Sequence, residues 1–320
     1  MKNIAVVGLG NIATRHRRNL KSLFPQAKVY ALSASGRKVA GPISDCDEVA
    51  SSIEQLAGFV DMAVIASPAP WHAEHAIPFI AANIPVLIEK PIVVSAEDAQ
   101  RLLEASKKFK TPLAVGYCLR YLPSARVTQR VLEEELAGQL LNARISIGQY
   151  LPDWRATKDY RDSVSASKAL GGGALLELSH EFDYARWMLG ELCVHSAIIR
   201  NSGTLGIEVE DLVDVVALTE RQAVVHLHLD FLQRKAHRQC DFIGTKGRIE
   251  WDLIQNQVLL QTAKGTEILY ADAAWDKNRM YLDMLTDFTR LIAGQPNQCI
   301  LVDDAVATIG LIENIKSVAG

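Results

Sequence analysis

The first 120 residues alternate short apolar runs with stretches whose apolar positions recur every three or four residues. The runs predict strands at 3–7, 28–33, 60–66, 85–89 and 113–117. The stretches between them predict helices at 11–23, 47–56, 72–82 and 96–109. Strands that alternate with helices in this way predict a parallel, doubly wound α/β sheet, and we place the first domain over residues 1–120.

The pattern changes after residue 120, where alternating strands replace the strand–helix repeat. A helix over 123–137 leads to a strand near 143–150, a loop over 151–170 and a helix over 174–189. Further strands are predicted at 194–201, 212–219, 222–231, 238–244, 248–254, 257–262 and 267–270, with helices at 276–293 and 303–317. The segments Glu220-Arg-Gln and Gly244-Thr-Lys-Gly247 suit hairpin turns. Residues 121–320 are therefore expected to form an α+β domain with a largely antiparallel open sheet.

The first strand runs directly into a glycine-rich turn, Gly8-Leu-Gly10-Asn11-Ile12-Ala13, which opens the first helix. Gly8 allows the tight turn, Gly10 lets the backbone approach a pyrophosphate, and the small Ala13 lets helix and strand pack closely. The N–H groups at the helix start, at Asn11 and Ile12, suit phosphate oxygens. The turn predicts a Rossmann-type dinucleotide-binding domain, with an ordinary glycine-rich turn as the alternative.

The end of the second strand distinguishes the two nicotinamide dinucleotides. Proteins that bind NAD usually place an acid there for the ribose 2′-hydroxyl, but no acid follows this strand until Asp45. Ser35, Arg37 and Lys38 stand there instead and suit a 2′-phosphate through charge-assisted hydrogen bonds. We therefore expect NADP to be preferred over NAD; the alternative is that both cations belong to a solvated turn.

Polar residues also follow the third and fourth strands. In open parallel sheets, ligands bind outside the carboxyl ends of the strands. The segment Glu89-Lys90-Pro91 places charges directly after an apolar run, which is costly unless they serve a site. A helix-start role is the simpler explanation for His72. The residues expected at the cofactor edge are Ser67, Pro68, His72, Glu89 and Lys90.

The helix predicted over 174–189 follows three glycines and carries a histidine among acids. Glu177, His180 and Asp183 or Tyr184 recur at intervals of three or four residues and therefore share a helix face. Such acids, Glu177 among them, can orient the imidazole and tune its pKa. A structural histidine is the alternative, and Glu181 or Asp183 can take the part of Glu177.

The long loop before this helix carries aromatic and basic side chains. Tyr150 and Trp154 offer flat apolar faces for a sugar ring, and Arg155, Lys158 and Arg161 can grip a phosphate or carboxylate. Long loops beside a site are often functional, so we expect Tyr150, Trp154, Arg155 and Arg161 to bind substrate. A structural or subunit-contact loop is the alternative.

These motifs together resemble those of the Gfo/Idh/MocA oxidoreductases, a family of NAD(P)-dependent sugar and cyclitol dehydrogenases. The resemblance covers essentially the whole chain. It rests on Gly8-x-Gly10-x-x-Ala13, Ser67-Pro68 with His72, Glu89-Lys90-Pro91, Gly116-Tyr117-x-x-Arg120-Tyr121, and the glycine run leading to Glu177 and His180. It implies that Lys90 contacts substrate and nicotinamide and that His180 is the acid–base. We also expect Tyr117 beside the cofactor and Arg120 beside the substrate.

One departure from the family pattern concerns Glu177. Many members carry an acid four residues before this histidine, within a glycine-containing segment, whereas Glu177 precedes His180 by three residues through Leu178-Ser179. The part of Glu177 therefore stays open, with Glu181 or Asp183 as alternatives. The long loop is similar to that of members that accompany surface-polysaccharide pathways, which favours an amino sugar, a uronic acid or a nucleotide sugar.

The expected reaction is hydride transfer between a carbinol carbon of a sugar, sugar derivative or sugar nucleotide and a nicotinamide. His180 would exchange the hydroxyl proton, while Lys90 would hold and polarise that oxygen. A non-catalytic sensor of dinucleotide or sugar is the alternative, although a sensor needs neither residue. An imine or bilin reductase would keep the cofactor without explaining His180.

Composition narrows the remaining classes. A net charge of −3 gives no electrostatic case for nucleic acid or an anionic membrane. The early first strand leaves no room for a signal peptide, and no apolar stretch is long enough to span a membrane. The five cysteines match no metal or redox motif, so we expect reduced thiols in the cytoplasm and no metal site. An open antiparallel sheet would offer a face for pairing into a homodimer or homotetramer.

Overall fold

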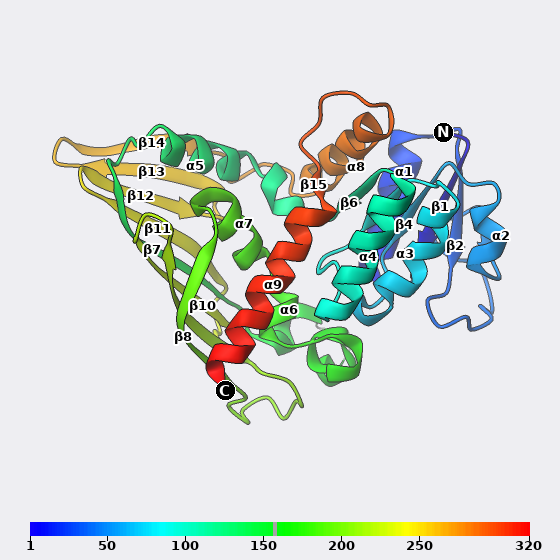
Figure 1. The fold of residues 1–320 in the computed structure, drawn as a ribbon, viewed down its shortest axis with the longest axis horizontal. Coiled ribbons are helices and arrows are strands. Elements are labelled where there is room, and N and C mark those ends of the chain that lie inside the picture. Colours follow the sequence, from blue (N-terminus) through cyan, green and yellow to red (C-terminus); the bar gives the residue numbers. More distant parts are fainter. Residues whose placement is uncertain (156–158) are drawn as a thin grey trace. The chain divides into compact units, whose positions relative to one another are not determined.

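The computed structural model describes residues 1–155 and 159–320, which form two compact units (Figure 1). The first unit comprises residues 1–118 and 278–309, and the second comprises 119–277 and 310–320. The chain therefore returns to the first unit near its end, whereas the expected boundary at residue 120 leaves no such return. Within the described ranges, no helix combines the length and apolarity needed to cross a bilayer.

The first unit is built on a seven-stranded sheet with the order β15-β6-β5-β4-β1-β2-β3. Its strand pairs are parallel apart from β15 with β6. The strands are β1 (Asn3–Val7), β2 (Lys28–Leu32), β3 (Glu48–Ala50), β4 (Met62–Ile65), β5 (Val86–Ile88), β6 (Leu113–Val115) and β15 (Ile300–Leu301). The helices are α1 (Asn11–Leu23), α2 (Ile53–Ala57), α3 (His72–Ala81), α4 (Ala96–Phe109) and α8 (Arg279–Ile292), and α9 (Val302–Ala319) is divided between the units. The predicted doubly wound sheet is confirmed.

Burial explains the apolar composition of these strands. The residues of β4, β5 and β6 are all buried, as expected for parallel strands covered on both faces. Helix α4 is capped by Ser95, whose hydroxyl accepts a hydrogen bond from the Asp98 backbone N–H at 3.1 Å. The expected helix over 47–56 is wrong in its first half, because β3 pairs with β2 there and α2 begins only after its cap residue, Ser52.

The second unit is built on an eight-stranded sheet with the order β14-β13-β12-β11-β7-β10-β9-β8. Neighbouring strands are antiparallel apart from β10 with β7. The strands are β7 (Leu140–Gly148), β8 (Leu192–Arg200), β9 (Leu212–Thr219), β10 (Val224–Asp230), β11 (His237–Gly244), β12 (Gly247–Asp252), β13 (Gln257–Thr262) and β14 (Gly265–Ala271). The largely antiparallel sheet and the two hairpin turns, after β9 and after β11, are confirmed as predicted.

One face of this sheet is covered by helices and the other is open. The helices are α5 (Pro123–Glu133), α6 (Ala174–Glu177) and α7 (His180–Leu189). Trp251 of β12 donates a hydrogen bond to Ser124 of α5 at 2.8 Å and packs edge-on against Tyr184 of α7, so α5 and α7 share one face. Along β9, buried and half-buried residues alternate, which is the period of two expected when only one face is covered.

Two expected elements of this unit differ in detail. The helix over 174–189 is broken, because α6 ends at Glu177 and α7 begins at His180. The loop over 151–170 contains short 3-10 turns: η3 (Leu151–Arg155), η4 (Tyr160–Asp162), η5 (Val164–Ala166) and η6 (Lys168–Leu170). These turns place Trp154, Tyr160 and Arg161 on defined backbone on either side of the segment 156–158.

Candidate functional site

The turn between β1 and α1 forms a cradle of backbone groups. Gly8 has a φ of +121°, and a Cβ there would collide with the Ala66 carbonyl, so the turn requires glycine. A Cβ at the exposed Gly10 would meet nothing within 4 Å. No described side chain caps the start of α1, and its first turn holds no acid. The first N–H groups of α1, at Asn11 and Ile12, therefore fit a pyrophosphate.

The inner face of α1 is fixed by Arg17, which sequence reasoning missed. Ala13 is buried there, as the close packing of helix and strand requires. The buried Arg17 guanidinium donates hydrogen bonds to the Gly8 carbonyl at 3.2 Å, to Thr14 Oγ1 at 2.8 Å and to the Ser44 carbonyl at 2.9 Å. It thereby ties the glycine turn to the segment that follows β2.

The residues after β2 leave cations exposed beside the cradle. Ser33 and Ser35 lie with their hydroxyl oxygens 3.4 Å apart. Ser35, Arg37 and Lys38 are exposed, and neither cation has an ion-pair partner in the described part of the chain. These side chains can donate to a phosphate, and no acid competes for them at this strand end.

His72 holds two loops together at the end of β4. It is buried at the start of α3, with Nε2 at 2.8 Å from the Ser67 carbonyl and Nδ1 at 3.0 Å from the Pro91 carbonyl. Burial lowers the pKa of His72 below its usual value, against the hydrogen bonds to these carbonyls. The Ser67 hydroxyl lies 2.9 Å from His75 Nδ1, and Pro68 beside it is half-buried. The turn after β4 is therefore held rigidly by two histidines.

The carboxylate of Glu89 is also engaged inside the first unit. Its Oε1 lies 2.6 Å from His16 Nε2, and its Oε2 accepts the Lys90 backbone N–H at 3.2 Å. A Cβ at Gly116 would stand 3.1 Å from this carboxylate, so glycine lets the end of β6 come close. Tyr281 of α8 packs edge-on against His16. His16 was missed from the sequence, where its one signal is a place on the apolar face of α1.

The remaining expected residues of this unit lie at the same sheet edge. Lys90 is half-buried and Tyr117 is buried. Ile88 pairs with Val115, so each of the two residues follows its strand by two positions. The turns after β1 and β4 stand at the same carboxyl ends, because these strands are parallel to β5 and β6. The structure therefore brings the cradle, Ser67, Lys90 and Tyr117 to one edge.

In the second unit, two arginines hold the acids beside His180. His180 is the buried first residue of α7. The Glu181 carboxylate accepts hydrogen bonds from Arg238 at 2.7 and 3.0 Å, and the Asp183 carboxylate accepts two from Arg120 at 3.0 and 2.6 Å. Such bidentate pairs fix geometry as well as charge, and here they fix the start of α7.

This arrangement changes the parts expected for the acids. Glu177 and His180 lie on different helices, so the continuous helix face that paired them is wrong. Glu181 and Asp183 each serve an arginine and thereby position α7. Two nitrogens of Arg120 donate hydrogen bonds to Asp183. This arginine therefore helps to hold α7 in place, in addition to its expected contact with the substrate.

Two of the expected substrate residues lie against the loop after β10. The Arg234 guanidinium carbon stands 3.7 Å from the centre of the Tyr150 ring. Trp154 packs edge-on against Phe231, with 5.3 Å between ring centroids. Sequence reasoning missed Arg234, because it follows Tyr150 by more than eighty positions and belongs to no motif.

The basic residues of the long loop are placed less fully. Arg161 is exposed, donates to Asp159 at 2.9 and 3.3 Å, and lies over the Tyr160 ring. The side chain of Arg155 and the whole of Lys158 lie outside the described residues. Of the three expected cations, only Arg161 is therefore seen, and it has a local acid partner.

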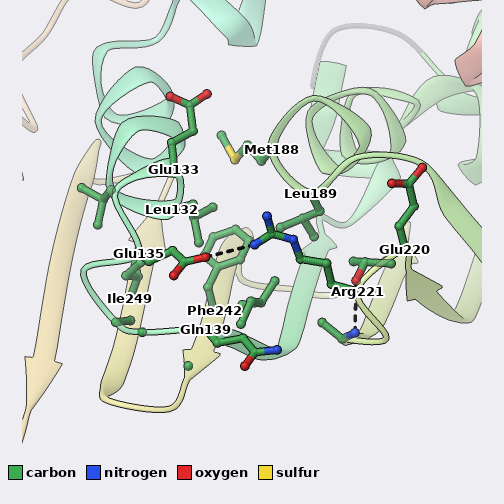
Figure 2. Close-up of a pocket in the computed structure, with 17 residues that line it drawn as sticks. Leu132, Glu133, Glu135, Gln139, Met188, Leu189, Glu220, Arg221, Phe242 and Ile249 are labelled. Atoms are coloured by element: carbon green, nitrogen blue, oxygen red, sulfur yellow. Dashed lines mark hydrogen bonds and ion pairs between the residues drawn. The ribbon is translucent and has the colours of Figure 1, made fainter.

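A separate hollow of about 400 Å³ opens among α5, α7 and the turns after β9 and β11 (Figure 2). Arg221 and Glu135 form an ion pair at its rim, 3.0 Å apart. None of the expected site residues lines it. In the described ranges, no group of three or more His, Cys, Asp or Glu is arranged to hold a metal ion.

Two family models match the chain. Residues 2–117 match the oxidoreductase family with an NAD-binding Rossmann fold, and residues 126–250 match the GFO/IDH/MocA C-terminal domain. The rhizopine catabolism protein MocA of Rhizobium meliloti is 30% identical over 59% of this chain and 57% of its own length, which is less than two thirds. An inositol 2-dehydrogenase of Acidiphilium cryptum is 27% identical over 76% of this chain and 72% of its own.

Solved structures share the fold over nearly the full chain. Levoglucosan dehydrogenase in complex with NADH and levoglucosan superposes with a TM-score of 0.85 at 18% identity, covering 99% of this chain and 96% of that one. GenD2 from gentamicin A biosynthesis, in complex with NAD, has a TM-score of 0.80 at 24% identity, covering 99% and 94%. With family models matching in both units, the chain belongs to the Gfo/Idh/MocA family of oxidoreductases.

Proposed function

We propose that the protein is an NAD(P)-dependent oxidoreductase that transfers a hydride between a carbinol carbon of a sugar or sugar derivative and the nicotinamide. The observation that carries this proposal is α7, which begins at the buried His180 and whose Glu181 and Asp183 are each held by an arginine in a bidentate pair. The relatives named as inositol 2-dehydrogenases support a polyhydroxylated substrate. A sugar nucleotide, amino sugar or uronic acid belongs to the same proposal.

The proposed chemistry divides between two side chains. In oxidation, His180 takes the carbinol proton at an imidazole nitrogen; in reduction it returns that proton, a role typically worth about 10²–10⁴-fold in rate. The Lys90 ammonium donates a hydrogen bond to the carbinol oxygen and stabilises the charge that develops there. When bound, the nicotinamide supplies the hydride acceptor or donor. Glu177, half-buried at the end of α6, is the proposed assistant of His180.

Turnover tests this proposal directly. The purified protein is incubated with NADP or NAD and a panel of sugars, uronic acids and nucleotide sugars while the nicotinamide absorbance is followed. A substrate-dependent change is expected and would name the substrate class. Binding of the dinucleotide with no change on any member of the panel would contradict the proposal and favour a non-catalytic sensor.

We further infer that NADP is preferred over NAD. Ser35, Arg37 and Lys38 support this, since they are exposed after β2 and the cations have no ion-pair partner in the described ranges. The Michaelis constant for NADP should be the lower one, and the double variant Arg37→Gln with Lys38→Gln should remove the difference. A lower constant for NAD in the wild type would contradict the inference.

We also infer a homodimer or homotetramer in the cytoplasm. The open face of the second sheet supports assembly, because it exposes apolar residues such as Ile198, which is 61% exposed, among charges of both signs such as Arg144 and Asp241. None of the five cysteines is in a disulfide, which suits a reducing compartment. Light scattering on the eluting protein measures the mass, and a monomer at micromolar concentration would contradict the assembly.

A further inference from the structure

The loop after β10 is locked at its base by Asp230. This buried carboxylate accepts the Leu232 and Gln233 backbone N–H groups on Oδ1 at 2.7 and 2.9 Å, and the Gln233 side chain on Oδ2 at 2.6 Å. Such bonds from an aspartate to the backbone two and three residues on define a rigid turn. The loop is also tied to the start of the long substrate loop, since the Leu151 N–H donates to the Phe231 carbonyl at 3.0 Å.

The locked loop presents an arginine on an aromatic platform. The guanidinium carbon of Arg234 stands 3.7 Å from the centre of the Tyr150 ring. Stacking at this distance holds the plane of the guanidinium and leaves its edge N–H groups able to donate. Arg234 is exposed, and no carboxylate in the described ranges forms an ion pair with it. The cation is therefore oriented without an anion.

A second donor in the same cluster also has no acceptor. Trp154 packs edge-on against Phe231, and its indole N–H is buried with no hydrogen-bond partner in the described part of the chain. An indole nitrogen can only donate, and buried donors are usually satisfied by protein, water or a ligand. Two donors without protein acceptors in the described ranges, one on Tyr150 and one beside Phe231, suit an oxygen-rich, negatively charged ligand.

This cluster lies at the same end of the second sheet as His180. Arg238, which grips the acid next to His180, follows Arg234 by four residues, so their Cα atoms are at most about 14 Å apart. The Ala174 N–H at the start of α6 donates to the Glu210 carbonyl, and the Phe231 N–H donates to the carbonyl one residue later.

We infer that Arg234, with Tyr150 and Trp154, binds an anionic group of the substrate, a carboxylate or a phosphate. The inference rests on the proposed oxidoreductase function and narrows its substrate to acidic sugars. The aromatic faces hold the ring, while the guanidinium edge and the indole N–H donate to the anion. Neutral sugars leave both donors without acceptors and are poorer substrates.

Matched substrates and matched variants test the inference. Uronic acids and sugar 6-phosphates are compared with the neutral parent sugars in the wild type, Arg234→Gln, Arg234→Lys and Lys235→Gln. The last variant removes the adjacent exposed cation and serves as the control. Arg234→Gln should raise the KM for acidic sugars about 10- to 100-fold with kcat changed little, and Arg234→Lys should restore part of the loss. If Arg234→Gln raises the KM for uronic acids, the bound group is a carboxylate; if it raises the KM for sugar 6-phosphates, the bound group is a phosphate.

Two results would overturn the inference while leaving the proposed function intact: equal kcat/KM for acidic and neutral sugars, or an acidic preference that survives Arg234→Gln. If no sugar is turned over although NADPH binds, the proposed function fails instead. The anion site is then tested by calorimetric titration with inorganic phosphate, which should bind the wild type at least about tenfold more tightly than Arg234→Gln. Equal affinities would overturn the anion site as well.

Discussion

The proposed pyrophosphate site of the first unit is made of backbone groups, whereas the proposed proton-transfer site of the second unit is made of side chains. Around the glycine turn, the polar side chains His16, Glu89 and His72 contact one another or backbone carbonyls. Around α7, charged side chains from distant segments meet in bidentate pairs. The two sites should therefore fail differently: the first when a Cβ is added, the second when a side chain is removed.

The largest effect is expected at His180. His180→Ala should lower kcat by about 10²–10⁴-fold, because the carbinol proton loses its acceptor, while dinucleotide affinity stays unchanged. Steady-state kinetics and a dinucleotide titration on the same sample measure both quantities. Added imidazole should recover part of the turnover. Wild-type kcat in the variant would reject the acid–base role.

The next effect concerns the pairs that hold α7. In Arg238→Gln, the Glu181 carboxylate stays buried, with 0% side-chain exposure, and loses its bidentate partner. Breaking a buried pair in this way should lower the free energy of unfolding by about 3–5 kcal/mol, measured by urea denaturation.

A control for this prediction lies on the neighbouring strand. Arg248 pairs with Asp241 and Glu250 but is 39% exposed, so Arg248→Gln should cost less than about 1 kcal/mol. Equal losses in the two variants would show that the Arg238 pair is no more important than a surface ion pair.

In the glycine turn, Gly8 is expected to affect stability and Gly10 to affect dinucleotide binding. Gly8→Ala should destabilise the first unit by about 1–3 kcal/mol, because its φ is +121° and the new Cβ collides with the Ala66 carbonyl. Gly10→Ala should leave the melting temperature unchanged yet weaken NADPH binding roughly tenfold, since its Cβ meets open space where a pyrophosphate would approach. Unchanged affinity in Gly10→Ala would contradict the cradle.

The smallest effect is a pH dependence on the open face of the second sheet. Hydrogen bonds to Asp230 and then Asp214 raise the pKa of His228 from 6.5 to about 9, against the effect of burial. Because the folded pKa is raised, this contribution to stability is complete below about pH 6.5 and is lost as the pH rises through about 9. The melting temperature should fall over this window in the wild type and fall less in His228→Gln.

The control is His226→Gln, at an exposed histidine on the same strand. That variant should keep the wild-type fall in melting temperature between pH 6.5 and 9. If His228→Gln and His226→Gln have the same pH profile as the wild type, the clamp between Asp214 and Asp230 does not stabilise the fold.

Local patterns made most of the fold predictable from the sequence. Helices α1, α3 and α4 of the first unit follow from the spacing of their apolar residues. The hairpin turns of the second unit follow from their turn residues, and both signals act over a few positions. The break between α6 and α7 could not be predicted, because Leu178 and Ser179 carry no helix-breaking signal. The return of residues 278–309 to the first unit depends on β15 pairing with β6, a contact between distant segments.

The residues of the candidate site also differ in whether they could be predicted from the sequence. The cradle could be predicted because Gly8, Gly10 and Ala13 are adjacent in sequence and each has a backbone reason. The partners of α7 could not, because Arg120 and Asp183 are 63 residues apart and no periodicity links them. The contact of Arg234 with Tyr150 could not be predicted from the sequence for the same reason, since only the fold brings the loop after β10 beside the substrate loop.

The central claim is that the glycine turn binds the cofactor and α7 carries the proton-transfer residue. Its most direct test measures the dinucleotide dissociation constant and kcat side by side for Gly10→Ala and His180→Ala. Opposite outcomes are expected: Gly10→Ala binds NADPH weakly and regains turnover at saturating cofactor, whereas His180→Ala binds it normally and turns over at most about one hundredth as fast. If His180→Ala lost cofactor affinity and kept its kcat, the assignment of proton transfer to α7 would be contradicted.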